Sequence, residues 1–282
     1  MKESFFLTIT CPDQPGIVAA VSSCLFGRGA NITEAEQFND HHTGRFFMRV
    51  VFEVDAGVGL DSALDELSGR FDMAWTIRAC AEKKKVLILV SKLDHCLADL
   101  LYRYRIGELA MDVVGIVSNH PRSALSLDMP GDIAYHHLPV TPETKPAQEA
   151  EIKQVVEETG AELVVLARYM QILSDDLSAY LEGRCVNIHH SSLPGFKGAK
   201  PYHQAYDHGV KLIGATAHFV TADLDEGPII EQDTRHITHA DEPADLVRKG
   251  RDIERQVLAR AVNYLLEDRV LLNGHKTVVF RD

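Results

Sequence analysis

Asn187 and His189 place an amide and an imidazole two residues apart, within the run Cys185-Val186-Asn187-Ile188-His189-His190-Ser191-Ser192-Leu193-Pro194. Where a strand ends, alternate residues point to the same side, so we expect these two side chains to face one pocket. The amide is a neutral hydrogen-bond donor, and the imidazole is a donor that can also carry a proton. Such a pair suits a carbonyl oxygen that becomes negative as a nucleophile attacks. The alternative is a purely structural strand end, where Asn187 caps a turn and His189 packs inside.

A second group of candidate residues follows another expected strand. That strand delivers His218, and the loop after it holds three acidic residues, Asp223, Asp225 and Glu226. Loops at strand ends often present functional groups on a rigid scaffold, but acidic turns are also typical of a solvated surface. Carboxylates beside His189 or His218 would also suit a metal ion. Because the sequence lacks a tight spacing of histidine and carboxylate ligands, we expect no metal.

Strands and helices alternate from Lys85 onward, and these elements must position both groups. Strands are expected at 86–90, 111–118, 133–137, 163–166, 212–220 and 229–237, and helices at 95–104, 145–159 and 244–266. Apolar strands separated by helices predict a mainly parallel, Rossmann-like sheet that is covered on both faces. Functional groups of such sheets lie at the carboxyl ends of strands. We therefore expect Asn187 and His189 to follow a strand of this sheet.

Residues 1–80 show a different order of strands and helices. Strands are expected at 4–10, 31–38, 45–54 and 73–79, with helices at 17–26 and 60–71. This βαββαβ order is the ferredoxin-like split motif. We expect a first domain at 1–80, a short linker at 81–84 and a second domain at 85–282. The fold class is therefore α/β, with two domains.

Composition excludes several classes of protein. The 282 residues carry a formal net charge of -12, which argues against binding to nucleic acid, since that needs a clustered positive surface. The five cysteines are widely spread, which favours a reducing cytoplasm without disulfides or a structural zinc site. We expect no signal peptide, since the N-terminal apolar run is too short. No window is long and apolar enough to cross a membrane.

The first domain resembles the ACT-domain family of small ligand-sensing modules. The residues that carry the resemblance are Asp13-Gln14-Pro15-Gly16-Ile17 and Asn31-Ile32. The resemblance implies an amino-acid effector, glycine or methionine, bound by Asp13, Gly16 and Asn31, and a homo-oligomer. The alternative is local: Asp13 caps a helix, Gly16 forms a turn and Asn31 an Asx turn.

The second domain, over residues 85–282, resembles the folate-dependent formyltransferase-like family. The motifs that carry the resemblance are Asn187-Ile188-His189-His190-Ser191-Ser192-Leu193-Pro194, Gly214-Ala215-Thr216-Ala217-His218 and Leu224-Asp225-Glu226-Gly227-Pro228. The resemblance implies that Asn187, His189 and Asp225 are catalytic. It also implies a pterin pocket formed by Met170, Gln171, Ile172 and Leu173, together with Thr221, Asp223 and Leu224. Ordinary core packing is the alternative for Met170, Ile172 and Leu173.

Two features bear on which reaction this family member runs. Transferase relatives hold a phosphate at a Gly-Ser-Asn turn after the first strand, whereas this chain has Ser91-Lys92-Leu93-Asp94-His95-Cys96 there. The stretch from Phe196 to Tyr206, together with the ACT-like domain, resembles the deformylase branch of the family. That resemblance implies hydrolysis of 10-formyltetrahydrofolate to tetrahydrofolate and formate, with formate feeding purine biosynthesis and no cofactor.

Two other functions stay open. One is a formyltransferase that acts on an amine such as glycinamide ribonucleotide. The other is a sensor whose second domain binds folate without catalysis.

Overall fold

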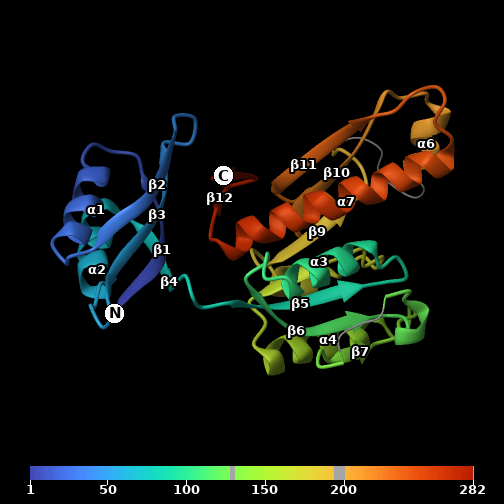
Figure 1. The fold of residues 1–282 in the computed structure, drawn as a ribbon, viewed down its shortest axis with the longest axis horizontal. Helices are drawn as coiled ribbons and strands as arrows, with labels where there is room; N and C mark the ends of the chain where they lie inside the picture. The colour runs from blue at the N-terminus through green and yellow to red at the C-terminus, as the bar shows by residue number, and fades with distance from the viewer. Residues whose placement is uncertain (128–130, 194–200, 282) are drawn as a thin grey trace. The chain divides into compact units, whose positions relative to one another are not determined.

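The computed structural model describes residues 1–127, 131–193 and 201–281, and the chain divides into two compact units (Figure 1). The first unit contains residues 1–83 together with 267–273 and the residues from 278 onward. The second contains residues 84–266 and 274–277. The sequence-based division assigned everything from residue 85 to the second domain. In the structure, most of the C-terminal segment instead groups with the first unit.

The second unit is built around a seven-stranded sheet in the order β11-β10-β9-β8-β5-β6-β7. Pairing is parallel from β9 across to β7, and β10 and β11 are added antiparallel at the other edge. The predicted mainly parallel α/β fold is thus confirmed. The strands are β5 (Lys84–Val90), β6 (Met111–Ser118), β7 (Tyr135–His137), β8 (Leu163–Leu166), β9 (Cys185–His189), β10 (Leu212–Phe219) and β11 (Ile229–His236).

Helices cover both faces of this sheet. On one face, α4 (Lys145–Thr159) and α5 (Asp175–Tyr180) pack on buried strand residues such as Leu87, Leu89 and Val164. The long helix α7 (Pro243–Leu266) contacts β9, β10 and β11, and also contacts α3 (His95–Arg105) and the short α6 (Pro201–Asp207). Both α5 and α6 were missed by the sequence analysis because they are too short for a helical period to show. Among the described residues, the helices lack the combination of length and apolar character that spanning a membrane requires.

The first unit has the predicted βαββαβ order. Its elements are β1 (Lys2–Pro12), α1 (Ile17–Phe26), β2 (Asn31–Asp40), β3 (Arg45–Asp55), α2 (Asp61–Phe71) and β4 (Ala74–Ala79). The strands form an antiparallel sheet in the order β2-β3-β1-β4. Alternate residues of β3, from Phe46 to Val54, share a core with Ile17 and Val21 of α1 and Leu64 of α2. One face of the sheet is therefore closed by the two helices.

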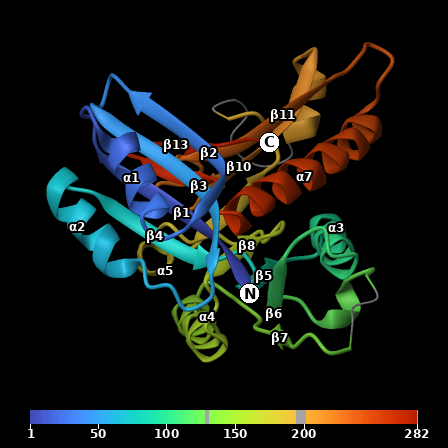
Figure 2. The same ribbon diagram turned by 60° about the vertical axis from the view of Figure 1, so that its left-hand side comes forward.

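The C-terminal segment packs against the opposite face of this sheet. Phe47 of β3 lies on that face, because side chains alternate along a strand. It forms a separate apolar cluster with Leu271, Val278 and Phe280. These residues flank or lie in the hairpin of β12 (Val270–Asn273) and β13 (Lys276–Val279), seen in red beside the strands of the first unit in Figure 2. The second face of the sheet is therefore partly covered, by the other end of the chain.

Arg49 is the buried charge beneath this segment, with 1% of its side chain exposed. Its Nε donates to the carbonyl oxygen of Glu267 at 3.0 Å, and its Nη1 lies 2.9 Å from a carboxylate oxygen of Glu34 and 3.5 Å from one of Glu36.

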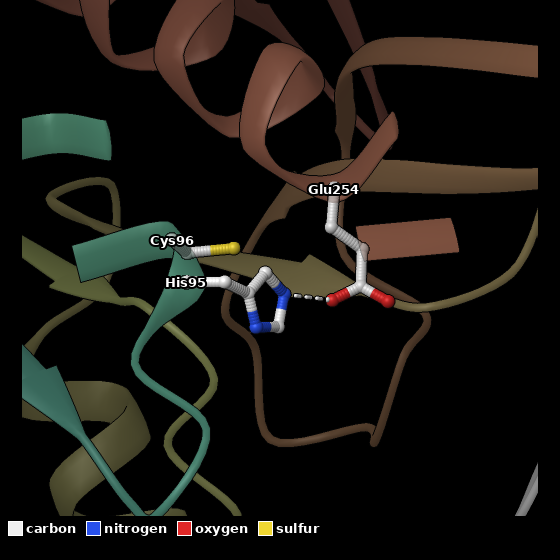
Figure 3. Close-up of side chains that lie close together, drawn as sticks. All are labelled: His95, Cys96 and Glu254. Atoms are coloured by element: carbon white, nitrogen blue, oxygen red, sulfur yellow. Dashed lines mark hydrogen bonds and ion pairs between the residues drawn. The ribbon is translucent and has the colours of Figure 1, made fainter. Parts of the chain in front are cut away.

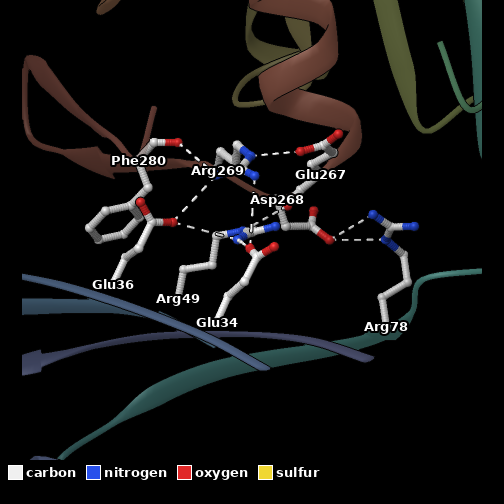
Figure 4. Close-up of polar contacts among 8 residues, drawn as sticks. All are labelled: Glu34, Glu36, Arg49, Arg78, Glu267, Asp268, Arg269 and Phe280. Carbon is white, nitrogen blue, oxygen red and sulfur yellow. Dashed lines mark hydrogen bonds and ion pairs between the residues drawn. The ribbon is translucent and has the colours of Figure 1, made fainter. Parts of the chain in front are cut away.

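Figure 4 shows the same two carboxylates turned toward Arg269, at 3.8 and 3.4 Å. A second ion pair joins Arg78 and Asp268 at 2.8 Å. Ion pairs between arginines and carboxylates therefore hold the C-terminal segment against the sheet, in addition to its apolar contacts.

We predict that Arg49→Ala destabilises the first unit. The substitution leaves the Glu267 carbonyl without its donor and removes a buried side chain that also pairs with Glu34 and Glu36, so the free energy of unfolding should fall by about 2–3 kcal/mol. The single tryptophan of the chain, Trp75, lies in β4 against the core of this unit. Its fluorescence during urea unfolding therefore reports on this unit selectively.

The matched control is Arg70→Ala, which removes an exposed arginine that lies 4.7 Å from the ring centre of Phe71. Its loss should change stability by no more than about 1 kcal/mol. Equal effects of the two substitutions would contradict the importance of the buried arginine.

Candidate active site

Asn187 and His189 lie in the last three residues of β9, rather than after it, and they contact His218 and Asp225 respectively. In the antiparallel pairing with β10, Asn187 is opposite His218. The amide Nδ2 of Asn187 lies 3.3 Å from Nε2 of His218, while Nδ1 of His218 donates to the carbonyl oxygen of Phe219 at 2.9 Å. A neutral His218 therefore accepts at Nε2 from Asn187. This contact fixes the direction of the amide and leaves its second hydrogen for another acceptor.

Asp225 joins the two imidazoles. Its Oδ1 lies 3.2 Å from Nδ1 of His189 and 3.7 Å from Nε2 of His218. The hydrogen bond from Nδ1 of His189, followed by the interaction with His218, holds the pKa of Asp225 well below its usual range, although partial burial opposes this effect. The carboxylate is therefore ionised wherever the protein is folded at ordinary pH. It can accept hydrogen bonds and stabilise positive charge on a neighbouring imidazole.

The other ring nitrogen of His189, Nε2, is buried and has no hydrogen-bond partner among the described residues. Buried polar atoms are nearly always paired in folded proteins. An unpaired imidazole nitrogen beside an oriented amide is thus a candidate contact for a bound ligand. Because its Nδ1 faces Asp225, the proton at Nε2 is the one available for exchange with that ligand.

The loop that carries Asp225 is held in an unusual conformation. Asp225 has a φ of 59°, in the left-handed region that non-glycine residues seldom adopt. Two residues later, a Cβ at Gly227 would lie 1.8 Å from the carbonyl oxygen of Phe219. The same stretch is closed by a hydrogen bond from the Phe219 amide to the Pro228 carbonyl at 2.9 Å. Glycine is therefore required at 227 to bring the Asp225 carboxylate to the two histidines.

A cavity of about 580 Å³ adjoins this group. It is lined by the three residues predicted to be catalytic and by all those predicted to bind substrate: Met170, Gln171, Ile172, Leu173, Thr221, Asp223 and Leu224. Three of these are large apolar side chains with about half their surface exposed, at 54% for Met170, 60% for Ile172 and 55% for Leu224. Grouped apolar surface of this kind marks a ligand-binding groove. Their exposure argues against the core-packing alternative for Met170 and Ile172.

The segment that contains Met170 is fixed at the carboxyl ends of β5 and β8. The hydroxyl of Ser91 accepts from the Met170 amide at 2.9 Å and donates to Oδ1 of Asn119 at 2.7 Å. The Ser91 amide donates to the Arg168 carbonyl at 3.2 Å. The exposed apolar side chains are therefore presented by a backbone that is tied to two neighbouring strands.

The turn after β5 is occupied by a carboxylate of the chain itself. Oδ2 of Asp94 accepts from the backbone amides of Ser126 at 2.6 Å and Leu127 at 3.0 Å, directly before α3 begins at His95. In a phosphate-binding turn, free backbone N–H groups at a helix start face the anion. Here the residue before the helix is Asp94, whose carboxylate bonds the loop at 126–127 and makes no capping bond to α3; its negative charge would repel an anion at this turn.

One polar group beside the cavity was not foreseen from the sequence. Glu254 of α7 has 1% of its side chain exposed. Its Oε2 lies 2.7 Å from Nε2 of His95 and 3.4 Å from Nε of Arg168, and its Oε1 accepts from the Tyr202 hydroxyl at 2.5 Å. We call these four residues the Glu254 cluster. A glutamate in a long charged helix looks the same in sequence whether it is buried or solvated, so no sequence signal identified it.

Figure 3 shows His95 and Glu254 beside Cys96, and the ligand-type atoms of these three lie within 4.8 Å of one another. Burial raises the pKa of Cys96 well above its ordinary value, so the thiol keeps its proton. The Glu254 carboxylate also has the Arg168 guanidinium as a partner. These features favour a hydrogen-bonded ion pair over a cation site.

The predicted effector residues lie in the first unit and are not gathered at one place. Gly16, with a φ of 95°, precedes α1 and lines a hollow between α1 and α2, but Asp13 and Asn31 do not line it. Asp13 accepts from the side-chain amide of Asn39 at 2.8 Å, and Asn31 is exposed at the start of β2. In the second unit, Pro194 of the first motif and residues 196–200 of the deformylase-like stretch lie outside the described residues.

Comparison with known proteins agrees with both units. Residues 84–262 match the model of the formyl transferase family, and residues 5–69 match that of the ACT domain. A formyltetrahydrofolate deformylase from Corynebacterium sp. (strain P-1) is 50% identical over 279 residues, which cover 98% of this chain and 97% of the relative.

Solved structures give the same result. The crystal structure of formyltetrahydrofolate deformylase from Burkholderia mallei superimposes with a TM-score of 0.92 at 53% identity, covering 99% of this chain and 100% of that one. Glycinamide ribonucleotide transformylase 1 from Symbiobacterium toebii is more distant, with a TM-score of 0.63 and 28% identity, and covers 71% of this chain and 95% of its own. The likeness over the full length, including both units, is to the former. The chain therefore belongs to the formyltetrahydrofolate deformylase family.

Proposed function

We propose that this protein hydrolyses 10-formyltetrahydrofolate to tetrahydrofolate and formate. The observation that carries the proposal is the group formed by Asn187, His189 and Asp225 at the wall of a cavity with exposed apolar side chains. The names of the full-length relatives support the same reaction. In the cytoplasm, this reaction would supply formate for purine biosynthesis and balance the pools of one-carbon units.

We assign Asn187, His189 and Asp225 different roles in the hydrolysis. Water forms a bond to the formyl carbon, and the carbonyl oxygen becomes an oxyanion that accepts from the Asn187 amide and from protonated Nε2 of His189. Asp225 stabilises the charged imidazole through Oδ1. Asp225 also orients the attacking water or accepts its proton as the new bond forms. The bond from carbon to N10 then breaks as the carbonyl re-forms, and N10 takes up the proton that the attacking water has lost.

The folate ring is assigned to the exposed apolar segment of the cavity. Met170, Ile172 and Leu173 would contact the pterin faces, and Leu224 would contact them from the loop after β10. Backbone groups between Thr221 and Asp225 would supply hydrogen bonds to the edge of the pterin. No cofactor is required, because both the nucleophile and the proton transfers are available from water and from side chains.

The turn after β5 favours water over a phosphate-bearing amine as the acceptor. The Asp94 carboxylate holds the backbone amides of Ser126 and Leu127, so an incoming phosphate would meet negative charge at this helix start. Incubating the purified protein with 10-formyltetrahydrofolate alone distinguishes the three functions. Release of formate supports hydrolysis, dependence on an added amine supports a transferase, and inertness supports a folate-binding sensor.

We further propose that the first unit binds an amino acid, glycine or methionine, and that the protein forms a homo-oligomer through this unit. The match to the ACT-domain model supports a small-molecule effector. Asp13, Gly16 and Asn31 are the proposed contacts, and because they are not gathered within one chain, they would meet at an interface between subunits. Formate release measured with and without each amino acid tests the effector. Sedimentation under the same conditions tests the assembly.

We predict that Asn187→Ala lowers kcat by about 10²–10³, because the loss of one oxyanion donor has an effect of this size. The KM for the folate should change little. Asn187→Asp, which keeps the shape but removes the N–H donor, should lose as much activity. The control is Gln154→Ala, which removes an amide on the surface of α4 that bonds only to Glu158 among the contacts described. A turnover unchanged in Asn187→Ala would exclude the oxyanion role.

We predict that Gly227→Ala lowers kcat by about 10², although no group that contacts substrate is removed. The new Cβ would lie 1.8 Å from a backbone carbonyl oxygen, so the loop that holds Asp225 must shift, and a shift of about 1 Å has this effect on rate. Gly69→Ala in α2, where nothing lies within 4 Å of the new Cβ, should leave kcat unchanged. Normal turnover by Gly227→Ala would show that the loop tolerates displacement.

A further inference from the structure

The Glu254 cluster forms one wall of the cavity from buried charged and polar side chains, which is energetically unfavourable. Burying a carboxylate and a guanidinium is costly even when they are paired, and apolar residues of similar volume would often be at least as stable. Yet Glu254 has 1% of its side chain exposed and Arg168 has 8%. The pKa of Glu254 is lowered, because its hydrogen bonds and the charge of Arg168 outweigh the effect of burial. The Glu254 carboxylate therefore stays charged in the folded protein. The place of the cluster in the cavity wall indicates what it does.

The cluster lies beside the proposed reacting groups. All four of its members line the same cavity as Asn187, His189 and Asp225. His190 connects the two groups, because its ring centre lies 5.0 Å from that of His189 and 6.3 Å from that of Tyr202.

The cavity wall thus has an apolar part, which includes Met170, Ile172 and Leu224, and a polar part formed by the cluster.

The side chains of the cluster are closely fixed. Both oxygens of the Glu254 carboxylate are taken, by His95 and Arg168 on one side and by the Tyr202 hydroxyl on the other. The Tyr202 ring packs against Gly250 of α7 so closely that a Cβ at Gly250 would lie 2.1 Å from it. Burial, followed by the charge of Glu254, raises the pKa of Tyr202, so its hydroxyl remains a donor. These contacts hold the side chains of the wall in place.

We propose that the Glu254 cluster determines the acceptor of the formyl group: its side chains fill the space beside His189 and His190 that an amine would need, so that only water reaches the formyl carbon. The inference rests on the proposed hydrolysis of 10-formyltetrahydrofolate. If the space were opened, the nitrogen of a primary amine would bond to the formyl carbon, the bond to N10 would break, and N10 would receive a proton lost by the amine. The products would then be a formamide and tetrahydrofolate.

His95→Ala is the substitution that tests this. It removes one imidazole from the cavity wall but leaves Glu254 paired with Arg168 and Tyr202. The purified variant is incubated with 10-formyltetrahydrofolate and glycinamide, and formate and formylglycinamide are measured together. We expect the wild type to give formate alone. The variant should raise the ratio of formylglycinamide to formate at least tenfold above the background of the wild type.

Cys96→Ala is the matched control, since it alters the next residue of α3, which is buried but does not line the cavity. Its product ratio should equal that of the wild type. His95→Asn, which opens a smaller space, should give an intermediate ratio and replaces His95→Ala if the latter does not fold.

The outcomes separate the two proposals. A folded His95 variant that still yields formate as its sole product would overturn the acceptor role, and so would one that loses hydrolysis without forming formylglycinamide. A wild type that releases no formate would instead overturn the proposed hydrolysis.

Discussion

The carboxylate of Asp225 is the group on which the rest of the site depends. It contacts His189 and His218 through a single oxygen, and its low pKa keeps it charged beside them. That charge orients the His189 ring by accepting from Nδ1, which leaves the buried Nε2 as the nitrogen that can contact a ligand. The requirement also explains the local backbone. The left-handed conformation at Asp225 and the close approach at Gly227 are unfavourable alone, but together they bring the carboxylate to the two rings.

The antiparallel edge of the sheet is what allows this arrangement. A purely parallel sheet would gather functional groups only from loops at the carboxyl ends of its strands. Because β10 runs antiparallel to β9, His218 lies directly opposite Asn187, and the loop that follows β10 returns beside the pair. An irregularity in pairing with β11 falls between Ala217 and His218. Bulges of this type often re-aim a side chain next to a functional site.

Sequence predicted the regular elements, and its motifs named Asn187, His189 and Asp225 as candidates, which the structure gathers at one cavity. Helices such as α1 and α4 are long enough for their apolar period to appear, and the predicted ranges 17–26 and 145–159 match the structure. Asn187, His189 and Asp225 were found because their motifs are specific. Glu254 was missed because burial of a charge depends on partners from three other segments, at His95, Arg168 and Tyr202. A sequence shows such residues only as ordinary charged or polar positions.

The sequence also did not predict that the C-terminal segment covers the sheet face that carries Phe47 and Arg49. This contact affects how the first unit folds. Phe47 and Arg49 indicate a second face that needs cover, but nothing nearby in sequence supplies it. The cover comes from residue 267 onward, so Arg49 and Glu267 are 218 positions apart when they meet. Contacts so distant in sequence form late, since closing a long loop is entropically unfavourable. During synthesis, the first unit must therefore keep Arg49 and Phe47 exposed until α7 is complete. Glu34 and Glu36 of β2 can pair with the arginine in the meantime, and the same carboxylates then pair with Arg269.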